Sequence, residues 1–355
     1  MATTERPELV SSGAGLASTV AAESHGELGT EGAVRARGYW EGVWIRFRRD
    51  KFAIAGGVYV TLVVLVGFIG APIAAHFLGH GPNDQFAGGL DPKTVLPVGP
   101  LSEVSTQPYP GAVGHFTQTF FFLGADGQLG RDEFLRLLYG TQASLEVAVG
   151  ATLVAMTIGV LMGALAGFYS GVTDTIISRM TEIVMAFPVL LFVIALASTA
   201  GERLNGITLG FLAPGALTLV IVLALFGWFY PARIVRAQVL SLREKEFVEA
   251  ARMIGTSDWK IIRSHVLPHL VAPIIVYSTL VVATNILAEA GLSFLGLGIQ
   301  QPTASWGNLL ATAPDYYLTQ PWLMVWPGMA VLITTLSFNL LGDGLRDAFD
   351  PRGNR

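Results

Sequence analysis

The chain has 355 residues, of which 52% are hydrophobic and 14% are charged, and its mean hydropathy is +0.55. This composition excludes an ordinary soluble domain and predicts an integral membrane protein. The net charge of -4 provides no basic surface for nucleic acid, and the lack of cysteine excludes disulfides, thiolate metal sites and a cysteine nucleophile. No Gly-x4-Gly-Lys-Ser/Thr phosphate loop occurs, so any ATP that serves this protein is expected to bind on another chain.

The first residues differ sharply in composition from the rest of the chain. Residues 1–38 are small and polar, with neither an apolar run to bury nor the apolar region of a signal peptide, and are expected to form a disordered tail. Residues 39–51 mix tryptophan with arginine directly before an apolar run, which is typical of a segment at a membrane surface. Residues 52–75 are the first predicted transmembrane helix.

A long stretch without regular periodicity follows that helix. Proline and glycine are frequent from residue 76 to about residue 118. This pattern predicts an extracytoplasmic excursion over residues 76–134, with room for short strands. Residues 135–347 are expected to form a core of five further membrane helices, and residues 348–355 a cytoplasmic stub.

Five apolar runs predict the remaining membrane helices. They cover about residues 145–168, 183–199, 216–230, 273–292 and 323–341. Pro188 is expected to kink the second of these runs, and Pro231 lies just beyond the end of the third. On the first run, glycines recur every four residues and give a smooth face for a neighbouring helix; they are Gly159, Gly163 and Gly167.

The positions of lysine and arginine orient the six predicted helices. An even number of spans places both termini on the same side of the membrane. With the termini in the cytoplasm, only four of the 22 basic residues would lie outside: Lys93, Arg131, Arg136 and Arg203. The positive-inside rule therefore predicts cytoplasmic termini and a cytoplasmic loop at about residues 240–268. The expected fold is an all-α integral membrane protein with six transmembrane helices.

The cytoplasmic loop has the pattern of a short helix with one packed face. Phe247, Ala251 and Ile254 fall on one side of the helical wheel and are expected to pack, while the charged residues lie elsewhere. Ala250 and Ala251 carry little side chain, so a backbone or an aromatic wall can approach them closely. The pattern indicates a helix that packs on one side and meets a partner or solvent on another.

A turn and a second short helix are expected to follow. Gly255 permits the positive φ that ends a helix. Thr256 or Ser257 can cap the next helix, with Asp258 near its positive end. Pro268 is expected to mark where the chain turns into the next apolar segment. The loop is therefore predicted to form helix, turn and helix at a membrane face.

The spacing of these residues resembles the cytoplasmic EAA loop of ABC importer permeases. The residues that carry the resemblance are Glu249, Ala250, Ala251, Gly255, His265, Leu267 and Pro268. His265 stands where that family often has isoleucine. The resemblance implies a mechanical role without catalysis, in which the helix rests in a groove of a cytoplasmic ATPase and transmits its closure to the membrane helices.

Further motifs in the same order resemble the second permease subunit of dipeptide, oligopeptide and nickel importers. They are Leu123-Gly124-Ala125-Asp126, Gly130-Arg131-Asp132, residues 289–298, Trp306-Gly307-Asn308 and residues 339–347. Matching segments extend from about residue 40 to residue 352. The resemblance implies the type I ABC importer permease fold.

The end of the fifth predicted helix holds the candidate gate or pore residues, which are Glu289, Ser293, Phe294, Gly296 and Gly298. Two interpretations stay open. The pattern either breaks the helix into a re-entrant turn near a gate, where irregular backbone is allowed beside protein or water, or forms a helix-packing seam.

Glu182 and Glu289 lie at or within apolar segments, where an ionised carboxylate is costly. Either could contact cargo. The favoured alternative is an interfacial or helix-capping carboxylate, with Arg179 pairing Glu182. Glu146, near the start of the second predicted helix, has no assigned role.

The end of the last predicted helix carries a polar group that is interpreted as a structural clamp. Its members are Asn339, Gly342, Asp343 and Arg346. Asp343 and Arg346 have the spacing of an ion pair on one helical face.

The resemblance implies that the chain forms half of a translocation pore in the inner or plasma membrane. The implied pore imports dipeptides or oligopeptides by alternating access. Nickel chelates or other small solutes are the alternative cargo. It implies a homologous second permease, two cytoplasmic ATPase subunits or domains carrying ATP and Mg²⁺, and an extracytoplasmic substrate-binding protein. On this chain no catalytic residue, metal site or cofactor is expected.

Two other classes of protein share parts of this pattern. A transporter driven by an ion gradient would keep ionisable residues at mid-membrane and often show inverted repeats, neither of which is evident. A membrane scaffold for an assembly machine would account for the docking loop but not for the gate-like turn.

Overall fold

The computed structural model describes residues 38–107, 117–195 and 215–350. The chain divides into two compact units, residues 1–45 and residues 46–355. In the first unit the described residues form most of α2 (Tyr39–Phe47). The tail predicted over residues 1–38 lies almost wholly outside the described residues, as do residues 351–355 of the predicted stub.

The second unit is built mainly from helices. They are α3 (Lys51–Leu65), a π-helical turn (Val66–Gly70), α4 (Ala71–Leu78), α5 (Glu133–Tyr169), α6 (Gly171–Ala186), α8 (Ala216–Gly227), α9 (Phe229–Leu242), α10 (Glu246–Met253), α11 (Asp258–Ile261), a second π-helical turn (Ile262–Val266), α12 (Leu267–Phe294), α13 (Trp306–Thr312) and α14 (Trp322–Phe349). Four short strands lie between α4 and α5.

Within the described residues, five continuous helical segments are long and apolar enough to cross a membrane. They are Lys51–Leu78, Glu133–Tyr169, Ala216–Leu242, Asp258–Phe294 and Trp322–Phe349. A sixth span exists if α6 and Val189–Ala195, which are bent by 76° at their junction, form one span. The break at Pro188 agrees with the predicted kink, and residues 196–199 of that predicted helix lie outside the described residues.

Three helical segments extend beyond the ranges predicted for their spans. The second span begins at Glu133 rather than near residue 145. Pro231 lies in the first turn of α9, where a backbone N–H has no intrahelical partner to lose, so the fourth span runs on to Leu242. Pro268 likewise lies in the first turn of α12, within a span that starts at Asp258.

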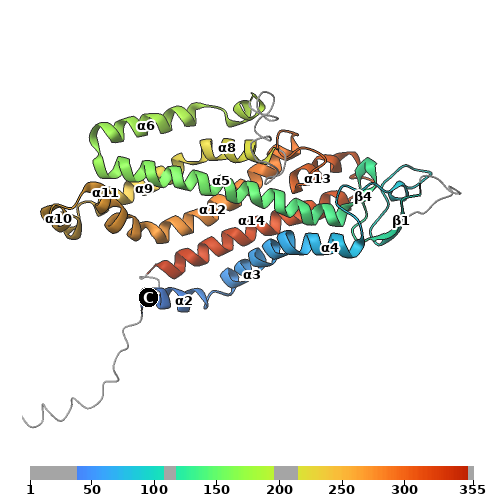
Figure 1. Cartoon of the computed structure of the whole chain (residues 1–355), viewed down its shortest axis with the longest axis horizontal. Helices are drawn as coiled ribbons and strands as arrows, with labels where there is room; N and C mark the ends of the chain where they lie inside the picture. Colours follow the sequence, from blue (N-terminus) through green and yellow to red (C-terminus); the bar gives the residue numbers. More distant parts are fainter. Residues whose placement is uncertain (1–37, 108–116, 196–214, 351–355) are drawn as a thin grey trace, which may run out of the picture. The chain divides into compact units, whose positions relative to one another are not determined.

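The three spaced glycines of α5 do form a packing face. A side chain on Gly159 would lie 2.7 Å from the carbonyl oxygen of Trp228, and one on Gly167 would lie 2.8 Å from that of Arg236. Gly163 is equally close to Ala232. α5 therefore packs directly on the backbone of α9, which leads into α10 (Figure 1).

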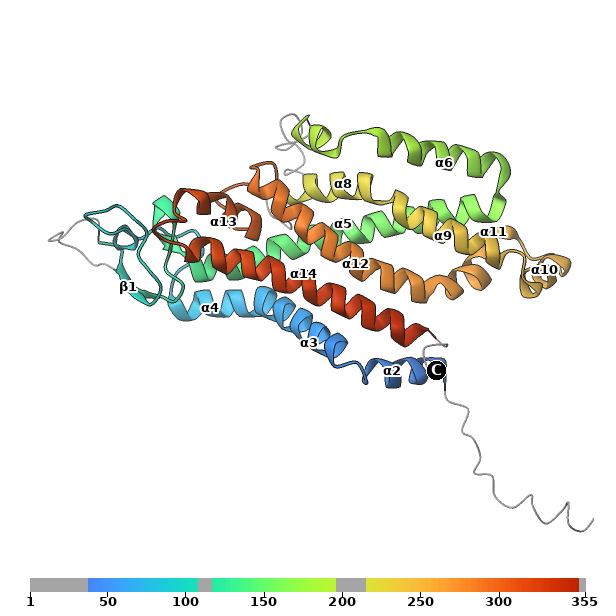
Figure 2. The ribbon, with the colours of Figure 1, turned by 180° about the vertical axis from the view of Figure 1, so that it is seen from behind.

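The predicted excursion contains the short strands that the sequence left room for. β1 (Ser102–Ser105) pairs antiparallel with β2 (Gln118–Phe121), and β3 (Ala125–Asp126) pairs with β4 (Arg131–Asp132). Phe86, Val104, Phe121 and Ala125 form its small apolar core. Within the second unit, these strands and α10 lie at opposite ends of the long helices (Figure 2).

Candidate functional site

α10 is a two-turn helix that ends in a tight, glycine-dependent turn. The N–H of Gly255 donates to the carbonyl of Arg252 at 2.9 Å, and the N–H of Thr256 donates to that of Ala251 at 3.1 Å. This pair of bonds is a Schellman motif, which needs a left-handed residue at its centre. Gly255 supplies it with a φ of +78°. The predicted helix, turn and helix are confirmed.

The second helix of the loop, α11, starts where it was expected and is continuous with the span that ends at Phe294. Ser257 is the N-cap residue of α11, although its side chain forms no capping hydrogen bond. Asp258 occupies the first turn, where a carboxylate meets the positive end of the helix. α11 then continues through the π-helical turn into α12, so the loop has one helical connection to the membrane core.

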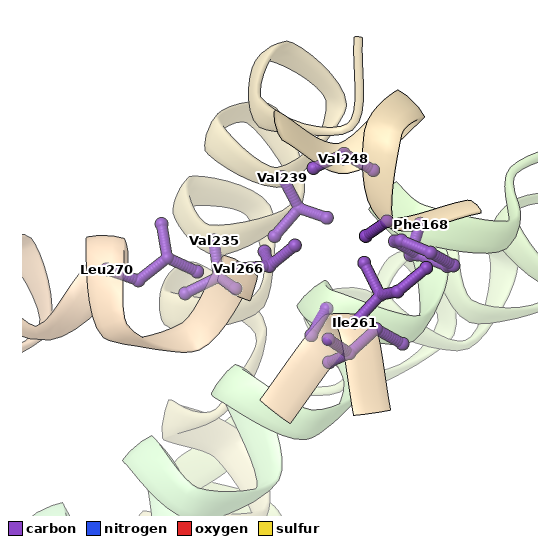
Figure 3. Packing of buried hydrophobic residues seen from close by; sticks show 10 residues of the cluster. Phe168, Val235, Val239, Val248, Ile261, Val266 and Leu270 are labelled. Carbon is purple, nitrogen blue, oxygen red and sulfur yellow. The ribbon is translucent and has the colours of Figure 1, made fainter. Parts of the chain in front are cut away.

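One apolar cluster fixes α10 to three long helices (Figure 3). Val248 and Ala251 are its members on α10. The others come from α5, α9 and the α11–α12 segment: Ala164, Phe168, Val235, Val239, Ile261, Ile262, Val266 and Leu270. Because close-packed side chains transmit displacement, a movement of α10 has to displace these helices too. Arg252 adds a cation–π contact, 5.0 Å from the ring centroid of Phe168.

The predicted packed face of α10 is partly wrong. Ala251 is buried, with only 5% of its surface exposed, but Ile254 is 82% exposed and Phe247 stacks on His269 with 5.0 Å between ring centroids. Val248, which the pattern did not single out, is fully buried. Ala251 therefore contacts this chain's own core and leaves no room there for another protein.

The opposite side of α10 is exposed and carries the features of a binding surface. We name Glu249, Ala250, Met253 and Ile254 the docking face. All four are exposed, and Met253 and Ile254 are each 82% exposed. Two large apolar side chains held in solvent on an anchored helix are typical of a protein contact site.

The other predicted loop residues lie next to this helix rather than on its docking face. His265 and Leu267 are half-buried and Pro268 is exposed, in the segment that runs from the second π-helical turn into α12. The backbone carbonyl of His265 contacts the Nδ1 atom of His269 at 2.6 Å. These residues connect α10 to the fifth span.

A second Schellman motif ends α12 at the candidate gate. The N–H of Gly296 donates to the carbonyl of Ser293 at 3.0 Å, and the N–H of Leu297 donates to that of Leu292 at 2.9 Å. Gly296 has a φ of +75°. The break therefore falls five residues beyond Gly291, which stays inside the helix, and Phe294 is the last residue of α12 with an exposed side chain.

Glu289 holds this turn from inside the protein. Its side chain is completely buried, and its Oε1 accepts a hydrogen bond from the Ser293 hydroxyl at 2.7 Å. The same hydroxyl accepts the N–H of Ile299 at 3.1 Å, while Gly298 packs against Ser293 with no space for a side chain. Glu289 is therefore a buried carboxylate that supports the end of α12, and its burial keeps it from contact with cargo in this conformation; its position relative to the membrane boundary stays a prediction.

The Trp306-Gly307-Asn308 motif closes the loop that follows the turn. Ser305 and Asn308 form a capping box at the start of α13, with bonds of 3.0 and 3.2 Å. The Ser144 hydroxyl on α5 accepts the N–H of Trp306 at 3.2 Å. Gly307 lies against the backbone of Ala290 on α12. The motif thus fixes the turn to α5 and α12.

The predicted clamp on α14 works through glycine rather than charge. Gly342 lies against Thr279 and Leu280 of α12, and the nearby Gly344 against Ala53 of α3. Asp343 and Arg346 are both exposed and form no ion pair in the described parts of the chain. Asn339 is half-buried.

Glu182 is paired as the favoured interpretation expected. Its Oε2 lies 2.6 Å from the guanidinium of Arg179, and both side chains are exposed. Glu146 is half-buried on α5 and takes part in interactions with its surroundings. In the described residues, no cluster of three or more histidines, aspartates and glutamates is placed to bind a metal ion.

A buried charged cluster gives a role to a motif that the sequence did not explain. Asp126 pairs with both Arg131 and Arg136 at 2.6 Å. Arg136 is fully buried and also donates to the carbonyl of Pro302 at 3.0 Å. The cluster therefore joins the excursion, α5 and the loop after the gate turn. The sequence did hint at this cluster, because Arg131 and Arg136 are two of the few basic residues predicted outside the membrane.

The chain matches two family descriptions and is similar to named transport permeases over most of its length. Residues 159–355 match the family described as "Binding-protein-dependent transport system inner membrane component", and residues 38–91 match "N-terminal TM domain of oligopeptide transport permease C". The glutathione transport system permease protein GsiD of Pectobacterium atrosepticum is 35% identical over 313 residues, which cover 88% of this chain and 91% of that protein. The dipeptide transport system permease protein DppC of Alkalihalophilus pseudofirmus is 34% identical over 315 residues, covering 88% and 90%.

Proposed function

The chain belongs to the family of binding-protein-dependent transport system inner membrane components, and from this premise we propose that it forms half of the pore of an ATP-driven peptide importer. The pore would carry dipeptides or oligopeptides into the cytoplasm by alternating access. The support for a peptide as cargo is that relatives over most of the chain bear the names of dipeptide and glutathione permeases.

The observation that carries the proposal is the construction of α10. Its docking face is exposed, while its other face lies in a cluster shared with α5, α9 and α12. A helix so built can receive force from a protein bound to one side and pass it to three membrane helices on the other. This is what coupling to an ATPase on a separate chain requires, since the present sequence has no phosphate loop of its own.

The proposed assembly combines this chain with four further parts. A homologous second permease completes the pore, two cytoplasmic ATPase subunits or domains bind ATP and Mg²⁺, and an extracytoplasmic binding protein delivers the cargo. The chain would cross the plasma or inner membrane six times as a type I permease, with α6 and residues 189–195 as the third span and both termini in the cytoplasm. The distribution of basic residues supports this orientation.

Uptake by the reconstituted complex tests the proposal. We expect peptide-loaded binding protein to stimulate ATP hydrolysis and to drive accumulation of labelled peptide inside proteoliposomes. An ATP-driven uptake of nickel chelates alone would assign the other cargo. Uptake that follows an ion gradient without ATP would identify a secondary transporter and contradict the proposal. Stimulation of hydrolysis without uptake of any solute would favour a membrane scaffold.

A further inference from the structure

α6 has three distinct sides. Successive residues of an α-helix are rotated by about 100°, so side chains four residues apart share a side. Ile177 and Thr181 form the buried side. One flank is polar and comprises Asp174, Thr175, Ser178, Arg179 and Glu182; the other is apolar and exposed and comprises Val172, Ile176, Met180 and Ile183.

The two flanks fit different surroundings. α6 belongs to a bent pair of helices that is apolar enough to count as one membrane span. The apolar flank suits lipid. An exposed ion pair such as Arg179 with Glu182 is costly in lipid, so the polar flank has to face water or protein.

A cleft of about 310 Å³ opens beside the polar flank, between α6, α5 and α9. Ser178 and Glu182 line it from α6, and Arg233 and Arg236 line it from α9. Asp174 fixes the spacing of the two helices, because its carboxylate bonds to the Arg236 guanidinium with one contact of 2.6 Å. The cleft is thus held open by a rigid, bidentate pair.

The charges around the cleft leave one cation without an acidic partner. Arg236 is neutralised by Asp174, and Arg179 by Glu182. Arg233 is exposed and forms no ion pair with any residue that the structure describes. An arginine in a concave polar site is suited to bind a carboxylate through two parallel hydrogen bonds.

We propose that this cleft is a cargo-binding site on the pathway, at which Arg233 binds the free C-terminal carboxylate of a peptide. This inference rests on the proposed function and adds the chemical group that is recognised and the residue that recognises it. A second permease covering the polar flank is the competing occupant. Cargo is favoured because the cleft is open and Arg233, which lines it, has no acidic partner among the described residues, which matches a solute with a free carboxyl group.

Cysteine labelling in the complete importer tests which flank meets water. The chain has no cysteine, so Thr175→Cys and Ser178→Cys introduce single thiols on the polar flank, and Ile176→Cys and Ile183→Cys are their controls on the apolar flank. A membrane-impermeant maleimide is added to inside-out vesicles. A maleimide reacts with the thiolate, and a thiol ionises to the thiolate only in contact with water. We therefore expect cysteines on the polar flank to be labelled at least about tenfold faster than those on the apolar flank.

Protection by peptide then tests the ligand. Dialanine and dialanine amide are added directly to the vesicles, so that the binding protein plays no part. We expect dialanine to slow labelling at residue 178 at least about fivefold and the amide to have no effect, because only dialanine has the carboxylate that Arg233 binds. Arg233→Gln should abolish the protection, and Arg233→Lys should keep part of it.

Three results would overturn the inference: polar-flank cysteines that stay unlabelled because the second permease covers them, equal labelling of both flanks, or identical protection by dialanine and its amide. These outcomes are separate from failure of the proposed function. An importer that shows selective protection but no ATP-driven uptake would keep the site and refute the transport assignment. An importer that transports peptide but shows no selective protection would refute the site and keep the transport assignment.

Discussion

Single residues at the ends of α10 and α12 set the geometry of both candidate sites. Gly255 and Gly296 each occupy the left-handed position of a Schellman motif, which turns the chain within two residues of the helix end. Open space surrounds the missing side chain at both positions. Backbone conformation, rather than crowding, is therefore the reason that these positions favour glycine.

Replacement of Gly255 tests this point. Gly255→Val should uncouple ATP hydrolysis from uptake or release the ATPase, because a β-branched residue resists positive φ at a cost of about 1–2 kcal/mol. Gly255→Asn is the matched control, since asparagine tolerates the same conformation. Hydrolysis and uptake are measured for both variants. Normal coupling in Gly255→Val would refute the coupling role of the turn.

His80 gives the excursion a dependence on pH. Burial lowers the pKa of His80, but its hydrogen bond with Asp132 at 3.1 Å, the Leu78 carbonyl and the charge of Asp84 outweigh that effect, so the pKa lies above its ordinary value of 6.5. The stabilisation is fully present below about pH 6.5 and is lost as pH rises through the raised pKa. The protection of residues 117–132 from hydrogen exchange, measured relative to the intrinsic exchange rate at each pH, should therefore fall above neutral pH, and this fall should vanish in His80→Phe.

Whole helices show which features local sequence can predict. The helix, turn and helix of the loop were predictable because Gly255 and Asp258 act within one or two turns. The buried face of α10 was predicted only in part, because side chains of α5 and α9, distant in sequence, decide that Val248 is covered and Ile254 is not. The environment of Glu289 was missed for the same reason: its turn is fixed by Ser144 and by the capping box of α13.

A larger residue in place of a packing glycine of α5 should disrupt the contact between α5 and α9. A side chain on Gly163 would lie 2.9 Å from the Cβ of Val235 and would press on the backbone of Ala232. Gly163→Leu is expected to destabilise the permease by about 1–3 kcal/mol or more, because neither backbone can yield. Gly291→Leu is the control, as the space beside this helical glycine is open. Thermal stability in detergent distinguishes the two, and equal values would refute the packing.

On the scale of the whole molecule, α5 is one long helix that links two distant parts of the protein. α5 begins directly after β4 and ends beside α10, a length of roughly 55 Å at 1.5 Å per residue. Arg136 near one end contacts the loop after the gate turn, and Phe168 near the other contacts the core under α10. One helix therefore connects the candidate gate with the candidate docking face.

Topology is the first property of this path that can be tested. Lys260 should lie in the cytoplasm and Lys93 outside it. Lys93→Cys should react with an impermeant maleimide added to intact cells, and Lys260→Cys should react only after the membrane is opened. The reverse labelling would refute the six-span orientation.

Co-purification with the ATPase shows whether the docking face holds it. Tagged permease variants are purified at matched expression and the ATPase that accompanies them is measured. Ile254→Asp and Ala250→Trp change only exposed positions on that face, while Ser264→Trp places the same bulk at an exposed position beyond α11. Burial of a charge or of a ring in the contact should cost about 1–3 kcal/mol, which is a loss of binding of roughly five- to 150-fold. We expect both docking-face variants to lose most of the ATPase and Ser264→Trp to retain it; full retention with all three would contradict the account.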